Sequence, residues 1–105
     1  LFRSFHYAVY ATIFNHMEDY AYSQEDLFLA GEILYRYFIG VFLETYVSLI
    51  QEHNINIGYR QERIFLLEYC MLEKAVYELG YEMNSRPRWA VIPLQGIMSI
   101  INETN

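Results

Sequence analysis

The stretch from Glu73 to Trp89 combines carboxylates, aromatic rings and basic groups at helical spacing. Residues four apart on an α-helix stack in one column. One such column holds groups of both charges: Lys74, Glu78, Glu82 and Arg86. The neighbouring column holds two rings, Tyr77 and Tyr81. Carboxylates accept hydrogen bonds from hydroxyl groups, and an aromatic ring packs on an apolar face. This surface is therefore a candidate sugar site, and the alternative is a solvated charge ladder.

The turn after this helix is marked by prolines. Pro87 is predicted to end the helix, because the residue before a proline disfavours helical angles. Trp89 follows the turn and either extends the aromatic surface or caps the core. An extended connector is expected from Arg86 to Pro93, and Pro93 suits the first position of a last helix.

Apolar periodicity places four helices along the chain. The first is predicted from Phe2 to Tyr22, largely buried and with a polar end at Glu18 and Asp19. Ser23 and Asp26 resemble a capping box, so a second helix should begin near Gln24 and run to about Glu52. Its apolar stripe is expected to consist of Leu27, Ala30, Leu34, Tyr37, Phe38, Val41, Thr45 and Leu49.

A loop from His53 to Gly58 divides the chain into halves, since asparagine and glycine tolerate turn geometry. A third helix is expected from about Gln61 to Asn84. The last helix should carry one apolar face made of Leu94, Ile97, Met98 and Ile101. No strand is expected, so the predicted fold is an all-α compact bundle of about four helices, in one helical domain spanning residues 1–105.

Composition excludes several classes of partner. The chain has 105 residues, 54% of them hydrophobic, and a formal net charge of -6. Such a charge opposes binding to nucleic acid and to anionic lipid surfaces. The longest stretches without charge, Ser4–Met17 and Trp89–Asn102, fall short of the roughly 18 residues that a membrane span needs. The single Cys70 cannot form an internal disulfide, which favours a cytoplasmic location, and it is predicted to be a buried packing residue.

Most catalytic constellations are missing from the sequence. It contains no glycine-rich phosphate loop, no H-E-x-x-H and no C-x-x-C motif. His6, His16 and His53 are scattered, and the first two are too far apart on one helix to share a metal ion. We therefore predict three structural histidines with satisfied hydrogen bonds, no catalytic residue and no metal or cofactor site in this chain.

Three segments near the end carry a family resemblance. They are Lys74-Ala-Val-Tyr-Glu-Leu-Gly-Tyr-Glu, Asn84-Ser-Arg-Pro-Arg-Trp and Ile92-Pro-Leu-Gln-Gly-Ile. Together they resemble the C-terminal end of bacterial maltokinases, including those fused behind trehalose synthase. The opening segment Arg3-Ser-Phe-His-Tyr-Ala is also similar to this family, and the middle of the chain is less so.

The resemblance implies that the chain is part of a larger kinase-like domain. Proteins of this family resemble aminoglycoside phosphotransferases, with an ATP-binding lobe and a helical lobe that binds maltose for phosphorylation to maltose 1-phosphate. The chain is similar to the last helices of the second lobe, and its start at Leu1 without Met fits a fragment. ATP, Mg²⁺ and the catalytic residues would then belong to the rest of the parent, and the fragment alone should be inactive.

The resemblance also assigns candidate maltose contacts. The positions that match the family's sugar-side helix are Tyr77, Glu78, Tyr81, Glu82 and Arg86. Ser85 stands where relatives often have Asn or His, and His6 where an acidic residue is common. Whether the parent is a free maltokinase or a trehalose synthase fusion stays open.

A second hypothesis treats the chain as a helical interaction module. Tyrosine-rich faces would then dock on a neighbouring domain or on a second copy, because large exposed apolar patches usually mark contacts. A homodimer through such faces is the corresponding expectation.

Overall fold

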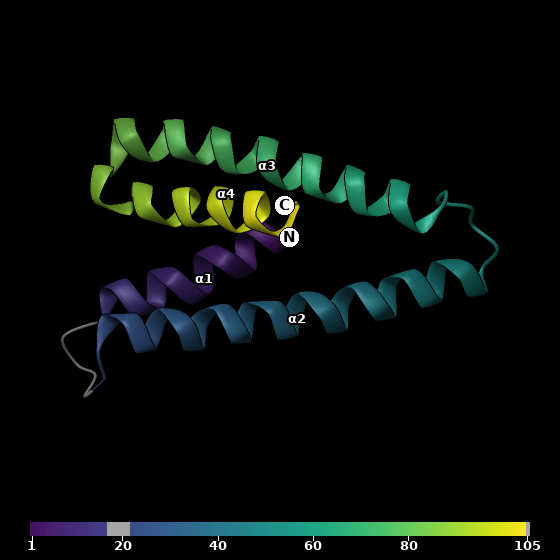
Figure 1. Ribbon diagram of the computed structural model, residues 1–105, viewed down its shortest axis with the longest axis horizontal. Helices are drawn as coiled ribbons and strands as arrows, with labels where there is room; N and C mark the ends of the chain where they lie inside the picture. The colour runs from purple at the N-terminus through teal and green to yellow at the C-terminus, as the bar shows by residue number, and fades with distance from the viewer. Residues whose placement is uncertain (17–21, 105) are drawn as a thin grey trace. The chain divides into compact units, whose positions relative to one another are not determined.

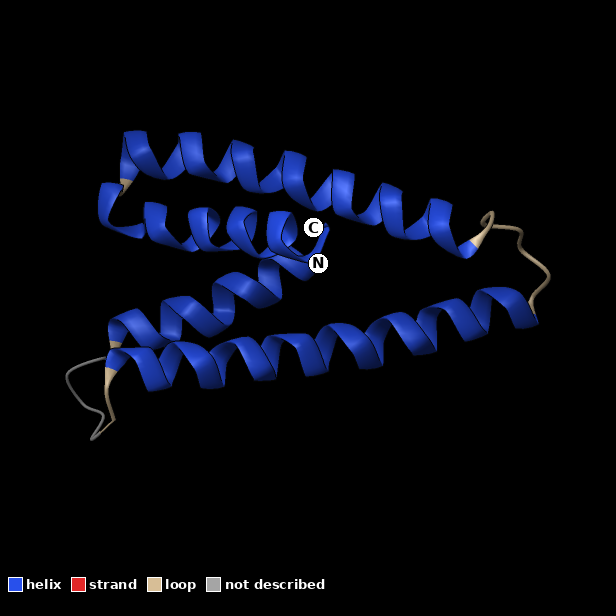
Figure 2. Cartoon of the chain, viewed as in Figure 1, coloured by secondary structure: helices blue, strands red, loops and turns tan. Residues whose placement is uncertain are grey.

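The computed structural model describes residues 1–16 and 22–104, and over them the chain is helical with no strand (Figure 2). Figure 1 shows the order of the elements: α1 (Phe2–Asn15), α2 (Gln24–Glu52), α3 (Arg60–Ser85), the 3₁₀-helix η2 (Pro87–Ala90) and α4 (Val91–Thr104). The all-α prediction is confirmed. The chain forms two compact units, an N-terminal unit (Leu1–Ile57) and a C-terminal unit (Gly58–Asn105). The assignment of one domain stays a prediction.

The predicted helix boundaries hold best where a side chain caps the helix. The Ser23 hydroxyl accepts the Asp26 backbone N–H at 3.2 Å, so α2 begins at Gln24 as expected. The loop prediction is also confirmed, because Asn54 and Gly58 have φ angles of 58° and 82°. The first helix ends at Asn15, earlier than predicted, and its expected polar end at Glu18 and Asp19 lies outside the described residues.

The N-terminal unit is an antiparallel pair of helices joined by edge-on and tilted ring contacts. Residues early in α1 contact residues late in α2 and the reverse, so the two helices are antiparallel. Four ring pairs have centroids within 6 Å: Phe14–Phe28, Tyr10–Phe28, His6–Tyr35 and Phe2–Phe42. Edge-on and tilted rings of this kind attract one another beyond their apolar burial.

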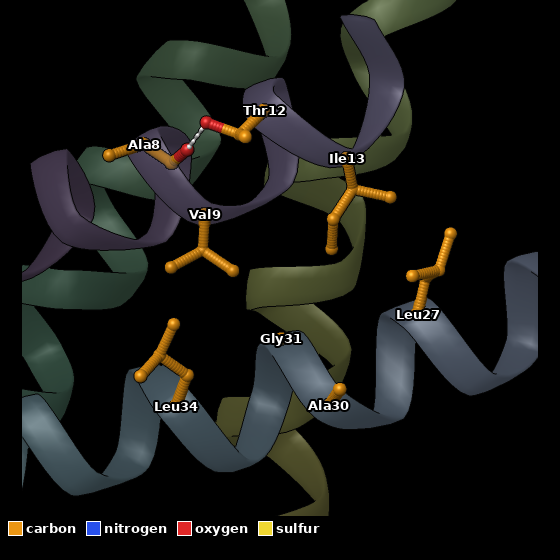
Figure 3. A pocket seen from close by; sticks show the side chains of 8 residues that line it. All are labelled: Ala8, Val9, Thr12, Ile13, Leu27, Ala30, Gly31 and Leu34. Atoms are coloured by element: carbon orange, nitrogen blue, oxygen red, sulfur yellow. Dashed lines mark hydrogen bonds between the residues drawn. The ribbon is translucent and has the colours of Figure 1, made fainter. Parts of the chain in front are cut away.

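Gly31 sets the separation of the two helices. A Cβ atom at this position would lie 2.9 Å from both Ile13 Cδ1 and Val9 Cγ1, closer than real side chains approach. Only glycine therefore lets the helices come this near. Beside it lies an apolar groove of about 360 Å³ between α1 and α2, shown in Figure 3. Its lining residues are Ala8, Val9, Thr12, Ile13, Leu27, Ala30, Gly31 and Leu34.

The predicted apolar stripe of α2 is only partly the face that packs: Leu27, Ala30 and Leu34 line the groove beside α1, but most of the stripe is exposed. Its members Leu34, Tyr37, Phe38, Val41 and Leu49 are between 43% and 66% exposed, whereas Gly31 and Tyr35 are the buried residues of α2. The helix is apolar around most of its circumference, so periodicity alone could not select a face. The contacts with the rings of α1 decide which face of α2 is buried.

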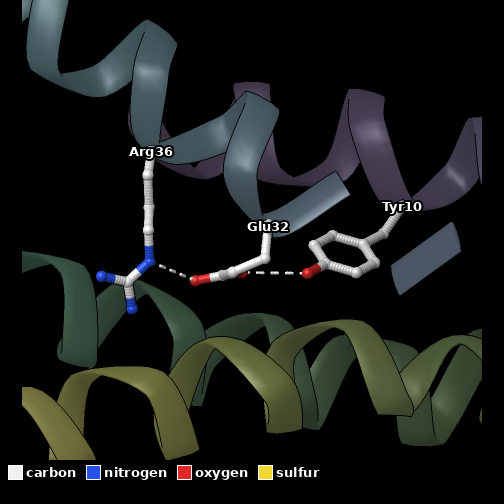
Figure 4. Close-up of polar contacts among 3 residues, drawn as sticks. All are labelled: Tyr10, Glu32 and Arg36. Atoms are coloured by element: carbon white, nitrogen blue, oxygen red, sulfur yellow. Dashed lines mark hydrogen bonds and ion pairs between the residues drawn. The ribbon is translucent and has the colours of Figure 1, made fainter. Parts of the chain in front are cut away.

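A network of hydrogen bonds also connects α1 to α2 (Figure 4). The fully buried Tyr10 donates its hydroxyl to Glu32 Oε2 at 2.9 Å. Glu32 Oε1 accepts the Nε–H of Arg36 at 3.0 Å. Burial and the neighbouring Glu32 carboxylate both raise the pKa of Tyr10, so the phenol stays protonated and remains a donor.

His6 is a buried packing residue, but the prediction that its hydrogen bonds are satisfied is wrong. It is 1% exposed and packs against the rings of Tyr10 and Tyr35 at 4.5 and 5.1 Å. Neither ring nitrogen has a hydrogen-bond partner. Burial, with a smaller contribution from the Arg3 charge, lowers the pKa of His6 from 6.5 to about 3. The imidazole is therefore neutral in the folded protein at pH 7.

The C-terminal unit is built from α3, η2 and α4. The segment predicted as an extended connector instead forms η2, in which the Trp89 N–H donates to the Arg86 carbonyl at 2.8 Å. Pro87 occupies the first turn of η2, where its missing N–H has no helical partner to lose. Pro93 is the third residue of α4 and not its first, because η2 leads directly into that helix.

Two burial predictions in this unit are wrong. Cys70 is exposed on α3 and is not a packing residue. The buried apolar positions of α4 include Ile92 and Ile100, at 0% and 7% exposure, and Pro93, whereas Leu94, Met98 and Ile101 are exposed. The face that packs is thus rotated relative to the predicted one. A short apolar helix offers more than one plausible stripe, and only its packing decides between them.

The α2 helix is long and apolar enough, by length and composition alone, to cross a membrane. It contains no long uncharged stretch, because Arg36 and Glu44 lie within its apolar part. These two properties do not separate a membrane span from a helix that packs against protein. The expectation of no membrane contact therefore stays a prediction.

Replacing Gly31 tests the close contact in the N-terminal unit. We expect Gly31→Ala to lower the free energy of unfolding by about 1 kcal/mol, because overpacking costs more than the helix propensity that alanine adds. Urea unfolding followed by circular dichroism measures the change. Gly80→Ala is the matched control, since a Cβ atom there has nothing within 4 Å and should stabilise α3. A stabilised Gly31→Ala variant would contradict the close contact.

Acid titration tests the buried His6. The unfolded chain binds a proton near pH 6.5 and the folded chain only near pH 3, so stability is lost as the pH falls through this window. We expect this histidine to contribute a slope of about 1.4 kcal/mol per pH unit there. His6→Phe should remove that slope, whereas the same change at the exposed His53 should keep it. Equal pH profiles for wild type and His6→Phe would refute the assignment.

Candidate functional site

The five predicted sugar-site residues lie together at the C-terminal end of α3 and its cap. The structure divides them by exposure. Tyr77 and Tyr81 are 66% and 54% exposed, whereas Glu78 and Glu82 are 9% and 1% exposed. Successive residues on a helix are about 100° apart, so the boundary between packed and exposed faces falls between the two columns. The single surface expected from the sequence is therefore divided into an aromatic face and a buried acidic face.

A fork-shaped ion pair joins Glu82 to Arg86. Arg86 donates its Nε–H to Glu82 Oε2 at 2.9 Å and its Nη2–H to Glu82 Oε1 at 2.7 Å. The glutamate side chain is 2% exposed and the arginine side chain 48% exposed. Two parallel charge-assisted bonds fix the plane of the guanidinium as well as its position. One edge of this group is held by protein, and part of it faces outward.

Trp89 completes this arrangement from the other side of the turn. The guanidinium carbon of Arg86 lies 4.2 Å from the centroid of the Trp89 ring. This distance is well within the range of cation–π attraction. The carboxylate of Glu82 and the ring of Trp89 thus hold Arg86 between them. We call Glu82, Arg86 and Trp89 the Arg86 clamp.

The backbone makes the Arg86 clamp possible. Arg86 is the C-cap of α3 with φ −143° and ψ 74°, outside the helical region that the following proline disfavours. Its N–H still donates to the Glu82 carbonyl at 2.7 Å, so the side chain remains above the last helical turn. The turn of η2 then brings Trp89 back towards it.

The ammonium group of Lys74 lies over an aromatic ring and does not pair with the glutamates of its column. Its ammonium nitrogen lies 4.9 Å from the centroid of the Tyr77 ring. A cation over an aromatic face is worth about 0.5–1 kcal/mol at an exposed site. Lys74 therefore orders one of the exposed rings, while Arg86 carries the ion pair with the acidic column.

The stacking of Arg86 on Trp89 gives the site its shape and was not predicted from the sequence. Arg86 and Trp89 are three residues apart with a proline between them, and a 3₁₀ turn brings residues at this spacing together. The Tyr10–Glu32–Arg36 network was also not predicted, and only the spacing of Glu32 and Arg36 was visible in the sequence. Within residues 1–16 and 22–104, no three histidine, cysteine or acidic side chains gather as metal ligands would.

No protein-family model matches the chain, and no solved structure matches it either.

Replacing Arg86 by lysine tests the Arg86 clamp. Lysine keeps the charge but cannot form the fork or stack as a plane, so we expect a loss of about 1 kcal/mol in the free energy of unfolding. Trp89 is the only tryptophan, so its fluorescence reports directly on the site. Arg86→Lys should change the emission spectrum of the folded protein. Arg88→Lys, at an exposed position of η2, should not, and equal spectral changes in both would contradict the clamp.

Proposed function

We propose that the chain is the C-terminal helical part of a maltokinase, in which the end of α3 forms one wall of a maltose pocket. The similarity of the segments around Lys74, Asn84 and Ile92 to that family supports this proposal. The parent would phosphorylate maltose with ATP to give maltose 1-phosphate. It would be a free maltokinase or a fusion with trehalose synthase, and it would be cytoplasmic.

The observation that carries the proposal is the Arg86 clamp. A half-exposed guanidinium is held rigidly between a buried carboxylate and an indole ring. A group fixed in this way can donate hydrogen bonds to sugar hydroxyls without losing side-chain entropy on binding. A surface arginine that served only solubility would not need two fixed partners.

The proposed roles follow from exposure. Arg86 would donate to hydroxyl oxygens of the sugar. The exposed rings of Tyr77 and Tyr81 would pack against a pyranose face, one of them ordered by Lys74. Glu82 would act through Arg86 as a positioning residue, because both of its oxygens already accept bonds from that side chain. Glu78 would contact maltose or position a group that does.

Catalysis would come from the rest of the parent. Phosphoryl transfer depends on a nucleotide lysine, a catalytic aspartate and carboxylates that hold Mg²⁺ against the phosphates. No segment of this sequence matches those motifs. In the proposed parent they precede Leu1, and the chain supplies substrate contacts alone.

A steady-state experiment in the full-length parent tests the sugar role. We expect Glu78→Ala to raise the KM for maltose by about tenfold, the effect of losing roughly 1.4 kcal/mol of binding, and to leave the KM for ATP within about twofold. Glu73→Ala is the matched control, because Glu73 is exposed on another face of α3.

Two outcomes would contradict the proposal. Equal effects of Glu78→Ala on maltose and ATP would indicate loss of folding and not of a sugar contact. Turnover of ATP by the isolated chain would show that the catalytic residues do not lie elsewhere.

The alternative proposal is a helical interaction module without a sugar role. It is favoured by one observation, the exposure of large apolar side chains along α2 and α3. The most exposed of these, apart from Tyr77, are Leu29, Ile33, Tyr37, Phe65 and Met83, all above 60%. Such surfaces usually mark contacts with other chains or domains.

A further inference from the structure

Gly40 lies in the middle of α2, where no close contact among the described residues requires a glycine. A Cβ atom at this position would meet no described atom within 4 Å, in contrast to Gly31. Glycine in a helix interior costs about 1 kcal/mol relative to alanine. The residue is exposed, so its missing side chain leaves the helix backbone open to a close neighbour from outside.

The surface around Gly40 is directed away from α1. Gly40 follows the buried Tyr35 by five residues, which places it about 140° around the helix from the packed face. We define the Gly40 face as the residues three, four, seven or eleven positions from this glycine. On the N-terminal side these are Leu29, Ile33, Arg36 and Tyr37, and on the C-terminal side Leu43, Glu44, Val47 and Gln51. Leu29, Ile33 and Tyr37 are each more than 60% exposed.

The Gly40 face is self-complementary about its centre. If two copies of α2 run antiparallel and cross at Gly40, each position pairs with the one equally far on the other side. Arg36 then faces Glu44, Ile33 faces Val47, and Tyr37 faces Leu43 of the other copy. The dimer thus contains two Arg36–Glu44 pairs, the two central kinds of pair are apolar, and Leu29 faces Gln51 at each end.

Charge also excludes the parallel arrangement. In a parallel pair, Arg36 would face Arg36 and Glu44 would face Glu44, and like charges at an interface oppose association. Arg36 already donates its Nε–H to Glu32, but its side chain is 55% exposed and a guanidinium has five donors. It can therefore bind a second carboxylate.

We propose that the Gly40 face is a homodimer interface, on which a second copy of this chain docks antiparallel with the two α2 helices crossing at Gly40. The face extends over 22 helical steps, about 33 Å at 1.5 Å per residue, which is long enough for a stable helix pair. Glycine at the crossing point lets the backbones approach. The two symmetric ion pairs fix the direction and register.

Sedimentation equilibrium of the complete chain over a range of concentrations tests the proposal. The wild type should associate to a dimer. Glu44→Arg places arginine against arginine twice per dimer, so the dissociation constant should rise by about tenfold or more, from roughly 1.4 kcal/mol over the two contacts. Glu52→Arg makes the same charge change at an exposed position outside the Gly40 face, and it should leave the dimer intact.

Mixing two variants gives the sharpest result. Arg36→Glu and Glu44→Arg should each be impaired as homodimers, yet a mixture should form a heterodimer in which every ion pair is restored with reversed sign. Circular dichroism checks that each variant remains helical. A wild type that is monomeric at every concentration would overturn the proposal. So would a Glu44→Arg variant that dimerises as strongly as Glu52→Arg, or a mixture that shows no gain.

Discussion

The close approach of α1 to α2 at Gly31 is the contact on which the N-terminal unit depends. A unit of two helices has little interior, so its stability rests on how near the helices come along one line. The missing side chain at Gly31 lets Val9 and Ile13 pack against backbone. With the separation set, the rings of α1 reach those of α2, and Tyr10 reaches Glu32. The buried and unpaired His6 is tolerated because it is neutral and surrounded by rings.

The C-terminal unit depends on a different constraint, the abrupt end of α3 before Pro87. The proline forces Arg86 out of helical geometry, and the 3₁₀ turn that follows returns the chain towards α4. The same turn brings Trp89 under the Arg86 guanidinium, while Glu82 holds it from the helix side. A structural requirement, to reverse the chain, thus produces a rigid and partly exposed cation. That coincidence of turn and clamp gives the proposed sugar wall its physical basis.

The two units offer different kinds of surface, and the two proposals follow from this difference. The end of α3 presents a fixed charge beside exposed phenol rings, which suits a ligand with both hydroxyl groups and apolar faces. The outer side of α2 presents apolar side chains around a glycine with opposite charges on either side, which suits another helix. The sugar role and the dimer are independent, since each could fail without affecting the other.

Local patterns in the sequence determined the helical class, the start of α2 and the loop from His53 to Gly58, because capping side chains and turn residues act on their immediate neighbours. They also placed the five candidate site residues at the end of one helix. Only the tertiary structure decided which faces pack. The apolar surface of α2 surrounds most of the helix, and its buried side is selected by rings of α1 that lie 14 to 40 residues away in the sequence. Likewise, exposure separated Tyr77 and Tyr81 from Glu78 and Glu82, and the turn of η2 joined Arg86 to Trp89. These outcomes depend on contacts between elements, which spacing along a single helix does not encode.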